Sequence, residues 1–172
     1  MRATWHECAA ELDAVSQQFR KAYWGTYSNS LPRDPRDDAE MVRTSKEGVQ
    51  ILRALALAVR SEQDFNLVPP IHVVVGAVKK EHARPEDAAQ VKQACGYAHV
   101  LALPGYTPLH LREALNKIAH PDPRSADYFI GQGNSAHELL LYGSNRGHNW
   151  FAAVSVLRLV SAIQALPDTA MQ

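Results

Sequence analysis

The chain has 172 residues, and its 18 Lys and Arg residues balance its 18 Asp and Glu residues, so the formal net charge is zero. This length fits one domain of residues 1–172 whose core needs no disulfide or metal, and the 46% apolar content excludes global disorder. Zero net charge excludes a nucleic-acid binder that relies on the field of the whole molecule, although it permits a local basic site.

The cysteines and the N-terminus indicate a cytoplasmic protein. Cys8 and Cys95 are too few for a four-cysteine zinc site or a disulfide scaffold. One bridge is arithmetically allowed, but two reduced thiols are the preferred interpretation. The first residues lack the apolar core of a signal peptide, and no stretch reaches the roughly 18 apolar residues of a membrane span. We therefore expect no membrane association.

The first third of the chain predicts two long helices. Residues 1–24 repeat apolar side chains at steps of three and four, namely Trp5, Cys8, Leu12, Val15, Phe19 and Ala22. Residues 28–38 contain two prolines and alternating charges, which indicates a loop. A second helix over residues 39–61 repeats the pattern with Val42, Val49, Leu52, Ala56 and Val59. Two such helices joined by a loop predict an antiparallel pair.

The middle of the chain is ambiguous. The β-branched side chains of residues 71–78 favour a strand, whereas the spacing of Ile71, Val74, Val75 and Val78 favours a helix that begins at Pro70. We prefer the helix because both neighbouring segments are predicted to be helical. A short helix over residues 85–95 follows, since a proline and acidic residues are typical of a first turn.

The C-terminal third predicts a helix, a loop, a hairpin and a final helix. The helix begins with Thr107 as its N-cap and ends at His120, and residues 121–136 form a polar loop. Turn residues between two apolar runs then predict a β-hairpin over about residues 138–154. A last helix covers about residues 156–166. The expected fold is mainly α: an antiparallel helical bundle with a C-terminal β-hairpin followed by a final helix.

The helix that ends at His120 carries the most informative polar pattern. Arg112, Asn116 and His120 are spaced by four residues, so they form one stripe beside an apolar helix face. Arginine binds phosphate, histidine moves protons near neutral pH and asparagine orients either group. Cleavage of RNA by its own 2′-hydroxyl needs these groups and no metal. In the structural alternative, Arg112 and Asn116 bridge neighbouring segments, and His120 lies where the helix dipole favours it.

Two further sets of residues are candidates for a binding site. His72, His82, His99 and His110 lack the i,i+4 spacing of a zinc-binding helix, so no metal site is expected. Arg146, with His148 and Trp150 after it, either contacts nucleic acid through charge and stacking or is a turn arginine beside a buried tryptophan.

The run Leu111-Arg112, followed by Asn116-Lys117-Ile118-Ala119-His120, resembles the signature helix of the HEPN superfamily, with seven residues between Arg112 and His120 where four to six are usual. The resemblance implies a helical bundle that dimerises around one composite site. It also implies that Arg112 and His120 are catalytic and that Asn116 assists. Some members are metal-independent ribonucleases of toxin and defence systems, and others are non-catalytic modules.

The leading hypothesis is therefore a metal-independent endoribonuclease of a toxin or defence type that cleaves RNA as a homodimer, without a cofactor. His120 would be the general acid or base, Arg112 would stabilise the charge on the phosphorus, and Asn116 would position the phosphate or the imidazole. Lys117 and Arg146 would bind the RNA, and an antitoxin or defence protein is a candidate partner. The alternative is a non-catalytic HEPN-like interaction or nucleotide-binding module.

Overall fold

A computed structural model describes residues 4–27, 34–69, 71–94, 96–120, 128–132 and 136–167. Helices and strands alternate along most of this part of the chain. Their order is α1 (Trp5–Tyr27), α2 (Pro35–Asp64), β1 (Val74–Lys79), α3 (Asp87–Ala94), α4 (Tyr97–Leu101), β2 (Tyr106–His110), α5 (Leu111–Ala119), β3 (Tyr128–Gln132), β4 (Ala136–Asn145), β5 (His148–Ser155) and α6 (Val156–Gln164).

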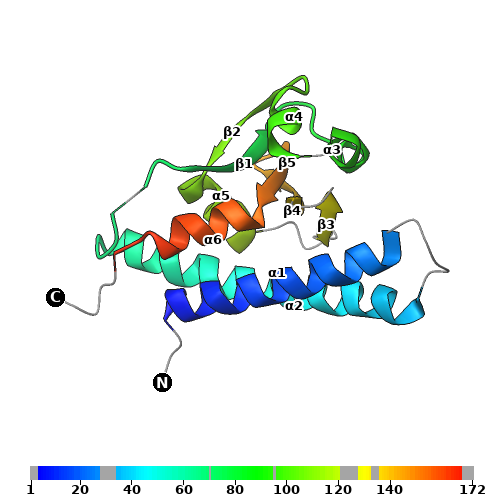
Figure 1. Cartoon of the computed structure of the whole chain (residues 1–172). Helices are drawn as coiled ribbons and strands as arrows, with labels where there is room; N and C mark the ends of the chain where they lie inside the picture. Colours follow the sequence, from blue (N-terminus) through cyan, green and yellow to red (C-terminus); the bar gives the residue numbers. More distant parts are fainter. Residues whose placement is uncertain are drawn as a thin grey trace.

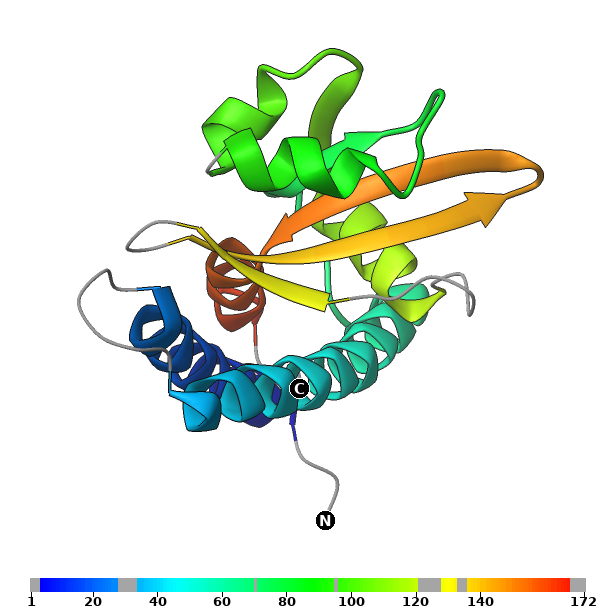
Figure 2. The same ribbon diagram turned by 90° about the vertical axis from the view of Figure 1, so that its right-hand side faces the viewer.

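The five strands form one antiparallel sheet in the order β2-β1-β5-β4-β3. The β4–β5 hairpin lies at its centre and is longer than its neighbours. β1 pairs with β5 only over residues 151–154, and β3 pairs with β4 only over residues 136–140. The turn end of the hairpin therefore projects beyond the rest of the sheet, as Figure 2 shows.

Helices cover both faces of the sheet. The antiparallel pair α1 and α2, with α5 and α6, packs on one face, and α3 and α4 pack on the other (Figure 1). Successive side chains of β4 point to opposite faces of the sheet. Leu139 and Leu141 therefore pack in the core with α1 and α2, whereas Leu140 packs in the core with α3 and α4. Within the described ranges, none of the helices combines the length and the apolar character that crossing a bilayer requires.

The predicted helical bundle with a single hairpin is wrong, because the chain is a mixed α/β protein with a five-stranded sheet. The preferred helix at residues 71–78 is strand β1. This strand is covered on both faces, so it is buried continuously from Val75 to Val78 and shows no alternation that would have identified it.

Two further segments differ from the prediction. The helix expected from Thr107 begins at Leu111, because residues 106–110 pair with β1 as strand β2. Within the predicted loop of residues 121–136, residues 128–132 form the edge strand β3, and the backbone N–H of Phe129 donates to the Ser45 hydroxyl of α2 at 3.0 Å. This hydrogen bond occupies a backbone N–H on the free edge of the sheet, so that N–H is not available for pairing with another strand.

Several local predictions are confirmed. The helical pair is present. The second helix starts earlier than the predicted residue 39, within the predicted loop of residues 28–38: α2 begins at Pro35 because Asp34 caps it by accepting from the N–H of Arg36 at 2.8 Å. The hairpin closes through Arg146 and Gly147, both with positive φ (51° and 83°), which is the backbone that a two-residue hairpin turn requires. The final helix covers residues 156–164.

Candidate functional site

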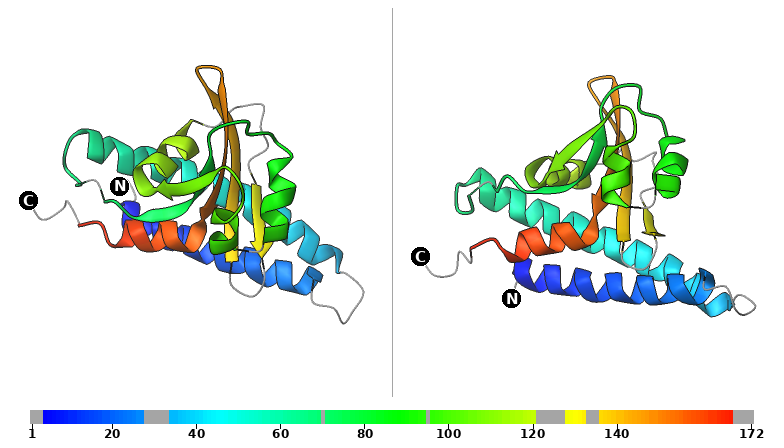
Figure 3. Two further views of the ribbon diagram at one scale, coloured as in Figure 1. Left: turned by 90° about the horizontal axis from the view of Figure 1, so that it is seen from above. Right: turned by 45° about the horizontal axis from the view of Figure 1, so that its top comes forward.

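Helix α5 places its apolar face in the core and its polar face at the surface. Leu111, Ala114, Leu115 and Ile118 are buried, and the helix lies beside the C-terminal half of α2 (Figure 3). The N–H of Leu111 donates to the carbonyl oxygen of Val73 at 2.8 Å, which ties the start of the helix to the sheet. The polar stripe predicted from the sequence therefore lies along an anchored helix, with Arg112 and Asn116 half-buried and His120 exposed.

A cleft of about 720 Å³ lies between α5, the end of α2, Lys80 directly after β1, and the projecting β4–β5 hairpin. Its walls come from four separate stretches of the chain. The lining residues are Arg60, Lys80, Glu113, Asn116, Lys117, His120, Ser144, Asn145, Arg146, His148 and Trp150.

The cleft is cationic although the chain as a whole is neutral. Among its described lining residues, the four cations Arg60, Lys80, Lys117 and Arg146 face a single carboxylate, Glu113. Concentrating one sign of charge in a concave surface raises the local concentration of the opposite ion. The arrangement therefore favours an anionic ligand.

Lys117 is much more buried than Lys80, the other lysine of the cleft. Its side chain is 12% exposed, and its Nζ lies 3.9 Å from the centroid of the Trp150 ring. Glu113 Oε1 lies 3.7 Å from Nζ of Lys117 and 3.1 Å from Nζ of Lys80, so one carboxylate serves two ammonium groups. Burial lowers the pKa of Lys117, and the charge of Glu113 opposes this shift. The aromatic ring partly replaces the water that Lys117 loses.

His120 is held at the C-terminal end of α5. Its backbone N–H donates to the carbonyl oxygen of Asn116 at 3.2 Å, and its ring Nε2 lies 2.8 Å from Nη1 of Arg60. A guanidinium can only donate, so Nε2 accepts this hydrogen bond and the ring proton is at Nδ1. The lone pair of His120 Nε2 therefore points toward the guanidinium of Arg60.

Asn116 and His148 complete the polar lining. Asn116 is half-buried, and its Oδ1 has no hydrogen-bond partner among the residues that the structure describes. His148 is exposed and pairs with Asn145 at the base of the hairpin turn. Two histidines thus line the cleft from different elements.

Arg112 lies outside the cleft. Its Nη1 donates to Oε1 of Gln63 at 2.9 Å, and its Nη2 forms an ion pair with Asp64 at the end of α2. The hydrogen bond from Arg112 lowers the pKa of Asp64. These contacts join α5 to α2, which is the bridging role of the structural alternative.

The structure thus brings four of the five predicted site residues, Asn116, Lys117, His120 and Arg146, to one cleft and separates Arg112 from them. The sequence did not predict Arg60, Lys80 or Glu113 as site residues. Helical spacing does predict Glu113 as the i,i+4 partner of Lys117, and the structure confirms this pair, but no local signal links Arg60 or Lys80 to α5.

The other groups that the sequence analysis considered, His72, His82, His99, His110 and Cys8, are not among the described residues that line the cleft. The described residues contain no group of three or more His, Cys, Asp or Glu side chains that could hold a metal ion. The rings of His72 and His110 lie 6.4 Å apart. Burial raises the pKa of the half-buried Cys8 thiol, and Cys95 lies outside the described residues.

No family model, curated protein or solved structure matches this chain. The resemblance of residues 111–120 to the HEPN signature helix therefore stays a prediction.

Proposed function

We propose that the cleft binds the phosphodiester backbone of RNA and that the protein cleaves RNA there without a metal ion. The observation that carries this proposal is the convergence of four cationic side chains and two histidines on one cleft with a single carboxylate among its described residues. Lysine and arginine suit phosphate oxygens, and histidine is the side chain best able to move protons near neutral pH.

In the proposed reaction, the RNA 2′-oxygen attacks the adjacent phosphorus. The phosphate draws the guanidinium of Arg60 away from His120, so that Nε2 of His120 takes the proton of the 2′-hydroxyl. The bond from phosphorus to the 5′-oxygen then breaks, leaving a 2′,3′-cyclic phosphate. His148, in its protonated form, gives a proton to the departing 5′-oxygen.

The cations have two roles in this scheme. Lys117, which is held beside Trp150 before the reaction, faces the negative charge that grows on the phosphoryl oxygens and stabilises it without reorganising. Arg60 faces the same charge once the phosphate has drawn it from His120. Arg146, at the exposed hairpin tip, binds a neighbouring phosphate. All these groups belong to one chain, so this scheme does not depend on the homodimer that the HEPN resemblance implies.

The test is cleavage of a fluorescent single-stranded RNA in the presence of EDTA. We expect products with a 2′,3′-cyclic phosphate, and we expect His120→Ala and His148→Ala each to lower the rate at least about 100-fold, the usual contribution of a general acid or base. His72→Ala is the matched control, because His72 is an exposed histidine outside the cleft. Intact RNA with the native protein, or equal cleavage by native protein and His120→Ala, contradicts the proposal.

A non-catalytic phosphate-binding module is the second candidate. The hydrogen bond that occupies Nε2 of His120 and the pairing of Arg112 with α2 favour it, because both groups are already used within the fold. Fluorescence anisotropy with the same RNA separates the two functions. Salt-sensitive binding without cleavage identifies the binding module.

A further inference from the structure

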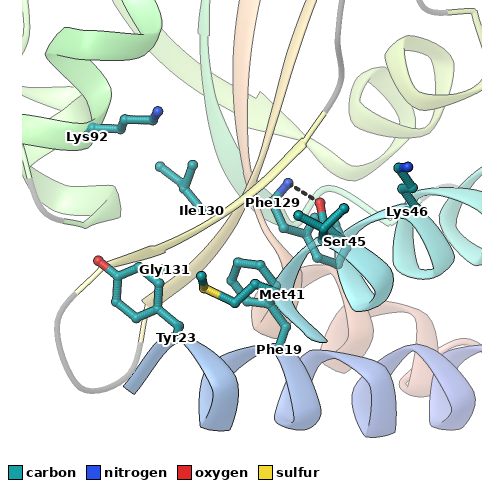
Figure 4. Close-up of a pocket in the computed structure, with 10 residues that line it drawn as sticks. Phe19, Tyr23, Met41, Ser45, Lys46, Lys92, Phe129, Ile130 and Gly131 are labelled. Atoms are coloured by element: carbon teal, nitrogen blue, oxygen red, sulfur yellow. Dashed lines mark hydrogen bonds between the residues drawn. The ribbon is translucent and has the colours of Figure 1, made fainter. Parts of the chain in front are cut away.

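A second cavity lies on the other side of the molecule from the hairpin turn. It has a volume of about 520 Å³ and lies between α1, α2, α3 and the edge strand β3 (Figure 4). It shares no described lining residue with the basic cleft. Its lining consists of Phe19, Tyr23, Met41, Val42, Ser45, Lys46, Lys92, Phe129, Ile130 and Gly131.

The floor of this cavity is apolar and is built from packed aromatic rings. Phe19 and Phe129 are buried and meet edge to face with their ring centroids 5.8 Å apart. The buried ring of His137 lies behind them, stacked on Phe19 at 4.6 Å and edge-on to Phe129 at 4.3 Å. Aromatic pairs in these geometries attract each other, so the floor does not collapse easily.

The ring of Tyr23 forms a wall beside this floor, and it can do so because residue 131 of β3 is a glycine. A Cβ added to Gly131 would lie 2.6 Å from ring atoms of Tyr23, so only glycine lets the Tyr23 ring cover this part of β3. Val42, at 55% exposure, is the most exposed apolar residue of the lining, so it marks the mouth. The cavity therefore has a closed apolar floor and an open side.

The charged residues of the cavity are both cations. Lys46 of α2 and Lys92 of α3 lie on opposite sides of the apolar side chains, as Figure 4 shows. No Asp or Glu is among the described residues that line it. An apolar floor flanked by positive charge is complementary to a molecule with an apolar body and an anionic end.

We propose that this cavity binds a medium-chain aliphatic carboxylate. The hydrocarbon chain lies over Phe19, Met41 and Phe129, and the carboxylate pairs with Lys46 or Lys92. A singly charged head is favoured because the two lysines are on opposite sides, so that one head meets one ammonium group. This site and its ligand do not depend on RNA binding or cleavage.

The experiment is isothermal titration of the full chain with decanoate. Decylammonium has the same tail with the opposite charge, decyl phosphate has a different anionic head, and acetate has no tail. We expect saturable binding of decanoate, affinities at least about tenfold lower for decylammonium and decyl phosphate, and no binding of acetate. In ¹⁵N NMR spectra, decanoate should shift the amide signals of Ile130 and Gly131.

Three variants locate the site. Lys46→Gln combined with Lys92→Gln should weaken decanoate binding about tenfold. Val42→Trp, a change at the exposed mouth, should block binding. Lys21→Gln is the matched control because Lys21 is exposed on α1 and does not line the cavity. Urea denaturation verifies that each variant is folded.

Four results would overturn the proposal: no saturable binding, equal affinity for decanoate and decylammonium, tighter binding of decyl phosphate, or unchanged binding by Val42→Trp.

Discussion

Glu138 is a carboxylic acid in the core, and its replacement by glutamine should change how the stability of the protein depends on pH. The residue lies on β4, is 2% exposed and pairs with Ile130 and Ser155 in the sheet. Its Oε2 has no hydrogen-bond partner within the described part of the chain. Burial raises the pKa of Glu138 from 4.5 to about 7, because the charged form loses its hydration.

The sign of the effect follows from this raised pKa. The unfolded chain ionises near pH 4.5, whereas the folded protein keeps the proton until about pH 7. The stability that the neutral acid contributes is fully present below pH 4.5 and is lost as the pH rises through 7. Each pKa unit corresponds to about 1.4 kcal/mol, so Glu138 by itself lowers the unfolding free energy by about 3 kcal/mol over this interval.

Urea denaturation of the native protein and Glu138→Gln at pH 5 and pH 8 measures this loss. Glutamine has nearly the same size and cannot ionise, so the variant should gain up to about 3 kcal/mol relative to the native protein between these two pH values. The neighbouring His137 does not confuse the comparison. Burial lowers the pKa of His137 from 6.5 to about 3, so His137 lowers the unfolding free energy below about pH 6.5. This effect is the same in both proteins and cancels in their difference.

An equal free-energy difference between the two proteins at pH 5 and pH 8 would refute this reasoning. It would mean that the carboxylate of Glu138 is ionised in the folded protein at both pH values or that water reaches it.

Three further predictions concern the cleft and the core. Lys117→Met keeps most of the buried hydrocarbon part of the side chain but removes the charge that would bind a phosphate. In anisotropy measurements, the slope of log RNA affinity against log salt concentration should therefore become about one unit less steep. Arg112→Met should destabilise the protein by about 1 kcal/mol through the lost bond to buried Gln63, without changing RNA affinity. Gly48→Ala would usually stabilise a helix by up to about 1 kcal/mol, but the new Cβ would lie 2.5 Å from Cζ of Phe129. We expect a net loss of about 1–3 kcal/mol in urea denaturation, because overpacking a rigid core outweighs helix propensity.

Gly25→Ala is the matched control for Gly48→Ala. The three atoms nearest to its new Cβ would all belong to the carboxylate group of Asp37, the end of a flexible side chain that can move away. A Gly48→Ala variant that is as stable as Gly25→Ala would contradict the overpacking argument. A lower RNA affinity of Arg112→Met would show that Arg112 takes part in RNA binding.

The long helices could be predicted because each of them buries one side. α1 and α2 present their buried residues at helical spacing, and this pattern depends only on local periodicity. The hairpin was also a local feature, since the turn at Arg146 and Gly147 is encoded by adjacent residues. These elements were therefore accessible without knowledge of the fold.

The rest of the sheet could not be predicted in this way. β1 is buried on both faces, so its apolar residues are continuous and fit a helix equally well. β2 contains Pro108, which is tolerated because this strand is at the edge of the sheet, a position that only the tertiary structure defines. β3 has only five residues, Tyr128–Gln132, and they show no alternation of apolar and polar side chains that would mark a strand.

The neutral, 172-residue sequence by itself determined the helical pair, the hairpin and the polar stripe on α5, because these features follow from spacing along the chain. Only the tertiary structure decided which charges share a site. Arg60 and Lys80 join Lys117 because α2 and the end of β1 pack against α5 and the hairpin, and Arg112 is withdrawn because α2 offers it Gln63 and Asp64. Such contacts connect residues about 40 or more positions apart, where periodicity carries no information.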